Sequence, residues 1–171
     1  MRKMQKATAT CYLILLLFFF ASCRTKSSPD VSFYYWKTRF DLNQYENKVM
    51  TENKVHSLYI RYFDVDLDPE SGQPQPVSTI TFASPLIPKT IIPVVFIKNR
   101  VFERGDSITA YALVKNILQL ITEINKKNKI TVSEVQFDCD WTDKTKDAFF
   151  LFLRSYKKLS GQIKNVHCLI Y

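Results

Sequence analysis

Apolar and polar residues are arranged in blocks that predict strands and helices in alternation along most of the chain. Runs rich in aromatic and β-branched residues, or alternating between apolar and polar positions, are typical of strands. Apolar residues spaced three and four apart are typical of a helix with one buried face. The predicted strands are residues 32–40, 58–66, 91–98, 132–141 and 163–171, with a short extra strand at 78–82.

Three helices are predicted in the connections between these strands. They cover residues 43–53, residues 110–124 and the stretch between Asp143 and Gly161. Asp106 or Ser107 is the predicted N-cap of the second helix, and Asp143 is the predicted N-cap of the third. Gly161 is the predicted stop of the third helix, because glycine readily takes the left-handed conformation that ends a helix.

Strands that alternate with helices predict a parallel sheet, either open and doubly wound or closed as a (β/α)8 barrel. The fourth strand favours the barrel. A polar face would be costly to bury under the helices of an open sheet, whereas the inner face of a barrel opens into a polar mouth. The predicted outward residues are Val135, Phe137, Cys139 and Trp141, and the predicted inward residues are Gln136, Asp138 and Asp140.

The length of the chain limits this barrel. A complete barrel takes about 250 residues, whereas this chain has 171 residues and ends in the fifth predicted strand. The expected fold class is therefore α/β, a (β/α)8 TIM-barrel-like domain truncated after about five strands. An incomplete barrel that closes by self-association is the alternative, because an open sheet would expose its edges and its inner face.

The N-terminus has the composition of a bacterial lipoprotein signal. Three basic residues precede the apolar run 11–21, which is too short to span a bilayer comfortably and fits a signal peptide. The segment from Phe20 to Cys23 (FASC) resembles a lipobox, which implies cleavage before Cys23 and acylation of its thiol. An ordinary secretory signal is the alternative. The predicted organisation is a signal peptide at 1–22, a lipidated linker at 23–30 and a barrel domain at 31–171.

Charge and cysteine content narrow the range of partners. The chain has a formal charge of +8, and loss of residues 1–22 leaves +5, spread along the sequence. No block of Lys and Arg marks a nucleic-acid surface, so no nucleic-acid partner is expected. Cys139 and Cys168 remain in the predicted domain. Export would permit a disulfide between them, and two buried thiols fit the sequence equally well.

The fourth predicted strand resembles a known motif. Residues 137–141 (FDCDW) resemble the fourth-strand motif of chitinase-type (family 18) glycoside hydrolases, D-G-x-D-x-D-x-E on a (β/α)8 barrel. Asp138 and Asp140 match its second and third acidic positions. Val135 stands in place of the first Asp, and Thr142 stands in place of the catalytic Glu.

A second resemblance covers most of residues 31–171. The sequence Y-W-K around Trp36, the sequence R-x-F-D-V-D from Arg61 to Asp66 and the later D-x-D-W are similar to uncharacterised barrel lipoproteins of Bacteroidetes-type bacteria. Members of that group are described as glycoside-hydrolase-like without an established activity. The resemblance implies a lipid-anchored envelope protein with a glycosidase-like barrel.

Polar and aromatic residues near the strand ends form the candidate site. Asp138 and Asp140 lie two apart on one strand face, so their Cβ atoms should be about 7 Å apart. Such a pair can supply the acid and the base or nucleophile for cleavage of a glycosidic bond. If Arg61 points inward, it could instead neutralise one of them. Catalysis, ligand binding and a structural polar plug all fit these residues. Two aromatic candidates for stacking on sugars are Trp36 and Trp141, each of which also fits a core position.

Alternating acidic residues at the end of the second strand and just after it raise the question of a metal. Asp64, Asp66 and Asp68 resemble the start of a calcium loop, but Pro69 and Gln75 stand where an EF-hand needs Gly and Glu. No His or Cys spacing predicts a metal site, and with three glycines the chain has no phosphate-binding loop. Neither a metal nor a cofactor is expected, and Asp64 remains a candidate ligand-binding residue.

Two functions follow from these features. The first is a lipid-anchored, exported protein of glycoside-hydrolase-like barrel type that acts on or binds a glycan, located in the bacterial cell envelope. The alternative is a non-catalytic glycan-binding or structural lipoprotein, which includes an inactive truncated fragment. The expected partners are a membrane and a carbohydrate.

Overall fold

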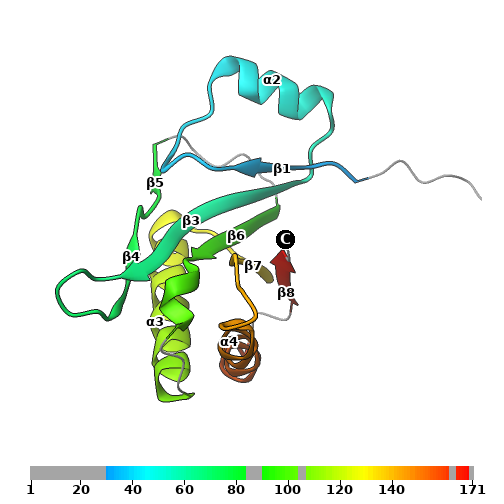
Figure 1. The fold of residues 1–171 in the computed structure, drawn as a ribbon. Helices are drawn as coiled ribbons and strands as arrows, with labels where there is room; N and C mark the ends of the chain where they lie inside the picture. The colour runs from blue at the N-terminus through cyan, green and yellow to red at the C-terminus, as the bar shows by residue number, and fades with distance from the viewer. Residues whose placement is uncertain (1–29, 84–89, 104–106, 162–164, 170–171) are drawn as a thin grey trace, which may run out of the picture.

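Five parallel strands form the centre of the fold (Figure 1). They are β1 (Ser32–Tyr35), β3 (Ser57–Leu67), β6 (Thr90–Ile97), β7 (Glu134–Asp138) and β8 (Asn165–Leu169), paired in that order. The computed structural model describes residues 30–83, 90–103, 107–161 and 165–169. The prediction of a mixed α/β fold with a parallel sheet is confirmed. Strand order follows chain order, without the reversal that marks a doubly wound sheet.

Helices pack on one face of this sheet. They are α2 (Gln44–Glu52), α3 (Ser107–Asn128) and α4 (Lys146–Leu159), with a short 3-10 helix η1 (Asn99–Phe102) after β6. Met50 of α2, Val114 of α3 and Phe149 of α4 belong to one hydrophobic cluster with alternate residues of the strands. Ser107, one of the two proposed N-caps of α3, is the first residue of the helix. The other proposed N-cap, Asp106, lies outside the described residues. None of the described helices combines the length and the apolar character that a membrane crossing requires.

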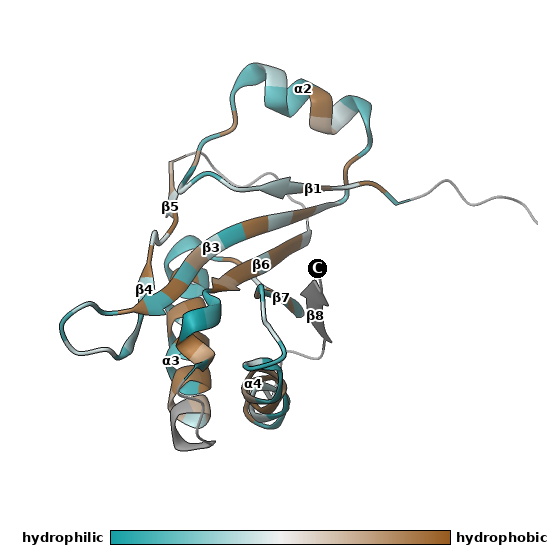
Figure 2. Ribbon diagram, viewed as in Figure 1, coloured by the Kyte–Doolittle hydropathy of each residue, from teal (hydrophilic) through white to brown (hydrophobic). Residues whose placement is uncertain are grey.

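β6 is buried on both of its faces, as its nearly continuous apolar sequence predicts. Val95 and Ile97 belong to the helix-side cluster, whereas Ile92 and Val94 are at most 3% exposed but lie outside that cluster. Because successive strand residues point to opposite faces, Ile92 and Val94 lie on the face away from the helices. Figure 2 shows hydrophobic colour along most of β6. The centre of the sheet is therefore covered on both sides.

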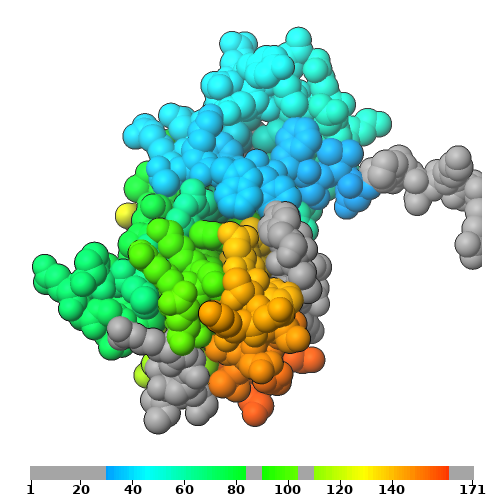
Figure 3. Space-filling view, in the orientation of Figure 1, coloured from blue at the N-terminus to red at the C-terminus, as the bar shows by residue number. Residues whose placement is uncertain are grey.

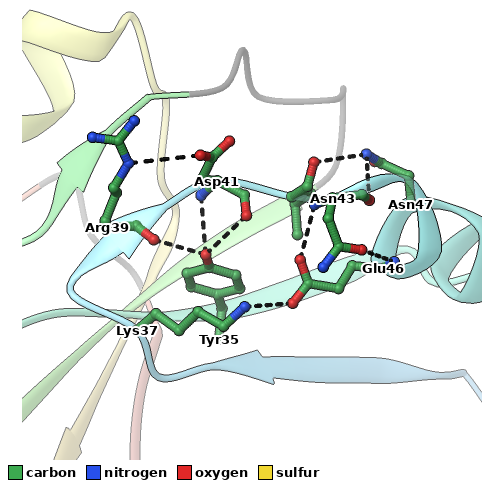
Figure 4. A network of polar contacts seen from close by, with 8 residues as sticks. Tyr35, Lys37, Arg39, Asp41, Asn43, Glu46 and Asn47 are labelled. Carbon is green, nitrogen blue, oxygen red and sulfur yellow. Dashed lines mark hydrogen bonds and ion pairs between the residues drawn. The ribbon is translucent and has the colours of Figure 1, made fainter.

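The prediction of a single strand over residues 32–40 is wrong, because the structure has two strands there. β1 ends at Tyr35, and β2 (Arg39–Phe40) pairs with β5 (Thr81–Phe82) in a separate two-stranded sheet. The chain folds back between β1 and β2, because the Tyr35 hydroxyl donates to the Arg39 carbonyl at 2.7 Å and accepts from the Asp41 N–H at 2.9 Å (Figure 4). Alternation of aromatic residues alone could not reveal this turn.

The proline-rich connection after β3 contains a strand that the sequence did not predict. β4 (Pro74–Val77) pairs antiparallel with the end of β3. The carboxylate of Asp68 accepts hydrogen bonds from the backbone of Glu70 at 3.1 Å and Ser71 at 2.7 Å. Gly72 takes a positive φ of 66° in the same turn. The sequence Asp-Pro-Glu-Ser-Gly is a turn signal, so this hairpin could have been inferred.

The boundaries of α4 match the prediction at one end only. Gly161 has a positive φ of 46° just after the helix, as predicted for its stop. The N-cap is Thr145 rather than Asp143. A turn precedes the helix, because the Thr142 carbonyl accepts from the N–H groups of Thr145 at 3.0 Å and Lys146 at 2.8 Å. This turn delays the start of α4 beyond Asp143.

Candidate functional site

The sheet face away from the helices carries most of the buried polar side chains. Asp64, Asp66, Gln136 and Asp138 are between 2% and 7% exposed. Asp64 pairs in register with Phe96, and Phe96 pairs with Asp138, so these three residues form a row across β3, β6 and β7. The row lies near the carboxyl ends of the strands, the edge at which parallel α/β sheets bind ligands.

A β-bulge brings Arg61 and Asp64 onto this face together. Residues three apart in a regular strand point to opposite faces, but the register of β3 against β6 shifts between Arg61 and Phe63. Tyr62 and Phe63 therefore both enter the helix-side core, at 0% and 1% exposed. Arg61 donates from Nε to Oδ1 of Asp64 at 2.6 Å and from Nη2 to Oδ2. Arg61 thus pairs with Asp64 rather than with the acidic residues of the fourth predicted strand.

A chain of hydrogen bonds crosses this face from β1 to β7. Tyr34 Oη donates to Gln136 Oε1 at 2.9 Å, and Gln136 Nε2 donates to Asp138 Oδ1 at 2.7 Å. Since β3 and β6 lie between them, β1 and β7 are about 14 Å apart along the sheet. Side chains standing perpendicular to a flat sheet could not meet across that distance. The sheet is therefore curved, and this face is concave; Figure 3 shows the blue N-terminal segment seated against green and yellow-orange segments.

The two candidate carboxylates have different surroundings. Asp138 is 3% exposed, and burial raises the pKa of its carboxyl. The hydrogen bond from Gln136 opposes this rise in pKa, whereas the negative charge of Asp140 adds to it. Asp140 itself lies past the end of β7 and is exposed. The burial of Asp138 therefore favours the protonated form of its carboxyl, the form that a general acid requires.

Three aromatic rings stack beside the polar row. The Tyr34 ring lies 5.7 Å from Trp36 at an interplanar angle of 12°, and 4.7 Å from Tyr59 at 26°. Trp36 is 46% exposed and Tyr34 is 42% exposed. Trp36 follows the carboxyl end of β1, next to the ion pair of Lys37 with Glu46 at 2.6 Å (Figure 4). Trp36 therefore lies between the end of β1 and this ion pair.

Trp36, Arg61, Phe96 and Asp138 line a pocket of about 240 Å³ on the concave face. Ligand pockets commonly measure about 300–1,000 Å³, so this pocket fits one ring or one end of a larger ligand. Another hollow, of about 250 Å³, lies between α3 and the β3–β4 hairpin, and its single charged residue is Glu123. The concave pocket is the better candidate, because charged and aromatic side chains converge on it.

Trp141 and Thr142 lie away from this pocket. Trp141 is partly buried against the core, with its ring 6.0 Å from that of Phe150 on α4. Trp141 thus takes the core position that the sequence also allowed, because the chain turns toward α4 after β7. Thr142, which replaces the glutamate of the family 18 motif, is exposed, and its N–H donates to Thr145 Oγ1 at 3.0 Å. Thr142 thus belongs to the turn that starts α4.

The other acidic residues at the end of β3 and just after it have structural partners. Asp66 accepts from Arg100 Nε and Lys98 Nζ, both at 2.6 Å, and these contacts hold the pKa of its carboxyl well below the usual range. Asp68 closes the hairpin turn. Within the described ranges, no group of three or more His, Cys, Asp or Glu side chains could hold a metal ion.

The cysteines are placed only in part. Cys139 is 1% exposed and carries a free thiol, and burial raises the pKa of that thiol to about 12, with Asp140 adding to the rise. A thiol with this pKa is inert at neutral pH. The side chain of Cys168 and the proposed lipidation site Cys23 lie outside the described residues, as does the predicted signal peptide.

The comparisons with known proteins give no relative for this arrangement. No family model, curated protein or solved structure matches the chain. The fold and the site themselves define a mixed α/β protein with a polar and aromatic concave face.

Sequence reasoning found part of this site. It named Trp36, Arg61 and Asp138, which line one pocket, but it missed the fourth lining residue, Phe96. It placed Gln136 on the inner face without naming it as a site residue, and it missed Tyr34 and Tyr59; these three residues complete the stack and the hydrogen-bonded chain. Phe96 is hidden in a continuous apolar run. Tyr34 and Tyr59 alternate with buried neighbours, and that alternation was the available signal.

Proposed function

We propose that this protein binds carbohydrate on its concave face and is attached to a bacterial envelope membrane by lipid on Cys23. The observation that carries glycan binding is the exposed stack of Trp36 and Tyr34 beside the pocket of Asp138. A sugar ring presents an apolar face that packs on an aromatic ring, and its hydroxyls need hydrogen-bond partners at the edge. Both requirements are met within one pocket.

The departure of this chain from the family 18 motif favours binding over catalysis. The position of the catalytic glutamate is occupied by Thr142, which takes part in a helix-starting turn. Hydrolysis is the second candidate, because the raised pKa of the buried Asp138 beside the exposed Asp140 would suit an acid with a neighbouring base. Release of reducing ends from a bound oligosaccharide would favour this candidate.

We infer that the sheet is a sector of a (β/α)8-type barrel. Two features support this inference: strand order follows chain order, and the face away from the helices is curved. In such barrels the carboxyl ends of the strands carry the ligand site. The concave pocket occupies the corresponding place, since it includes residues at the carboxyl ends of β6 and β7.

Removing the exposed indole is expected to abolish most glycan binding. Trp36→Ala deletes the outermost ring of the stack without touching the helix-side core. An aromatic anchor of this kind commonly contributes about 2 kcal/mol, which corresponds to a loss of affinity of about 30-fold. A glycan array followed by calorimetry with the best ligand measures the change.

The matched control is Tyr111→Ala, which removes an aromatic side chain that is 53% exposed on α3. This control should bind as the unaltered protein does. Equal binding by the Trp36→Ala protein would contradict the proposed site. If the unaltered protein binds no glycan, the concave face has a structural role, as in the alternative function.

The lipid attachment has its own test. Metabolic labelling with a fatty-acid analogue should tag the protein, because the analogue would be incorporated when Cys23 is acylated. The methylene groups of the acyl chains would then hold the protein on a membrane. Cys23→Ala should abolish the label, whereas Cys11→Ala, within the predicted signal, should leave it intact. A label that survives Cys23→Ala would rule out this lipoprotein assignment.

A further inference from the structure

The concave pocket contains a carboxylate oxygen to which no described residue donates. Asp138 is 3% exposed, and its Oδ1 accepts from Gln136 Nε2 at 2.7 Å. Tyr34 donates to the carbonyl oxygen of the same amide, which leaves the amide nitrogen of Gln136 for Asp138. Oδ2 of Asp138 accepts no hydrogen bond from the described residues. Because Asp138 lines the pocket, a bound ligand can supply the donor that this buried group needs.

The charges in and beside the pocket leave a negative excess. Arg61 is paired with Asp64, so their charges offset each other. Neither Asp138 nor the exposed Asp140 forms an ion pair with a described residue. The charge of Asp140 also acts on Asp138. A negatively charged ligand would therefore be repelled from the pocket, and a positively charged one would be attracted.

Arg61 keeps hydrogen-bond donors for a ligand even though its charge is offset. Its Nε and Nη2 are the atoms that bond to Asp64. The N–H groups of its Nη1 donate to no described residue. Arg61 lines the same pocket as Asp138. A ligand in this pocket thus meets fixed donors from Arg61 and one fixed acceptor from Asp138.

The exposed indole of Trp36 suits a ring that carries a positive charge. Its plane lies at 12° to the Tyr34 ring, and Trp36 is still 46% exposed. The face of an indole is negative and attracts cations. Ring C–H groups beside an ammonium group are electron-poor, so they pack on this face more favourably than those of a neutral sugar.

We infer that the glycan bound on the concave face contains an amino sugar with a free, positively charged amine. This inference rests on the glycan binding proposed above and names the class of sugar. The ammonium group donates to Oδ2 of Asp138, a neighbouring hydroxyl oxygen accepts from Nη1 of Arg61, and the ring packs on Trp36. The pocket of about 240 Å³ fits one such ring.

Other classes of sugar meet these groups less well. A neutral hydroxyl can donate to Asp138, but it does not offset the charge of the carboxylate. Burial raises the pKa of Asp138 and so opposes its charged form, whereas a nearby ammonium group favours that form. An N-acetyl group removes the positive charge of the amine. A uronic acid brings a further carboxylate toward Asp138 and Asp140.

Calorimetry of the full chain with matched trisaccharides tests this inference. The trimers of glucosamine, glucose and N-acetylglucosamine with the linkage of cellulose differ only at one ring carbon, and a glucuronic acid trimer is the anionic comparison. At neutral pH the glucosamine trimer should bind about tenfold more tightly than the glucose trimer, because a hydrogen bond between two charged groups is stronger than one from a neutral hydroxyl. About 0.5 M salt should reduce this advantage, since salt screens the attraction.

Variants that remove one charge locate the preference in the pocket. Asp138→Asn should weaken binding of the glucosamine trimer about tenfold, while binding of the glucose trimer stays within about twofold and shows that the variant is folded. Asp140→Asn, at an exposed position, should lower the preference by about twofold. The matched control is Glu70→Gln, which removes an exposed carboxylate on the β3–β4 hairpin and should change neither affinity.

The outcomes separate the class of sugar from glycan binding itself. Equal affinity for the glucosamine and glucose trimers would overturn the inference and leave glycan binding in place. Tighter binding of the N-acetylglucosamine or glucuronic acid trimer would do the same, as would a preference that survives both Asp138→Asn and Asp140→Asn. A chain that binds none of the trimers contradicts the proposed glycan binding as well.

Discussion

Replacing Phe137 by alanine is expected to lower the free energy of unfolding by about 3–5 kcal/mol, the range for truncating a buried phenylalanine. Phe137 is fully buried, with its ring 5.0 Å from Phe152 and 4.7 Å from Tyr156 in edge-to-face contacts. The ring joins the centre of β7 to α4. Rigid aromatic neighbours cannot collapse fully into the space, so a cavity would remain. Urea unfolding followed by fluorescence and circular dichroism measures the loss.

Phe96→Ala is the matched control for Phe137→Ala. Phe96 lies on the adjacent strand, faces the concave side, and is only partly buried beside the pocket. Its truncation should cost about 1 kcal/mol, because part of the side chain already contacts water and no closed cavity would remain. If Phe96→Ala destabilises the protein as much as Phe137→Ala, then the helix side is not the main core and the assignment of the two faces is wrong.

The order of strands and helices could be predicted from the sequence because it depends on short-range patterns. The alternation around Phe137, the helical spacing in α3 and the stop at Gly161 are local signals, and the structure agrees with each. The break between β1 and β2 depends on hydrogen bonds to a tyrosine hydroxyl several residues away. The pairing of β2 with β5 joins residues about 40 positions apart, which no local pattern encodes.

The sequence identified several residues of the candidate site by their type, but it did not show which side chains pair with one another. Arg61 and Asp138 were recognised as chemistry-bearing residues, yet the partner of Arg61 depends on a bulge that a regular period of two cannot anticipate. The contact of Tyr34 with Gln136 depends on the curvature of the sheet. The alternation of apolar and polar residues predicted a strand that continues to Trp141. In the structure β7 ends at Asp138, so Trp141 lies beyond the strand.

Arg61→Ala is expected to destabilise the protein by about 3 kcal/mol at neutral pH, because it leaves a buried carboxylate without its partner. Asp64 is 5% exposed and receives two hydrogen bonds from the guanidinium of Arg61. Adding Asp64→Asn to Arg61→Ala should recover most of the loss, since a neutral amide strands no charge.

Arg39→Ala is the matched control, because Arg39 pairs with Asp41 at 3.6 Å on the surface, with both side chains more than half exposed. Its loss should cost less than about 1 kcal/mol. Thermal and urea unfolding of the four proteins at neutral pH gives the comparison. If the double variant is no more stable than Arg61→Ala, then the cost comes from lost packing of the Arg61 stem. The bulge in β3 would in that case serve to place Arg61 at the pocket, and its pairing with Asp64 would be incidental to the stability of the fold.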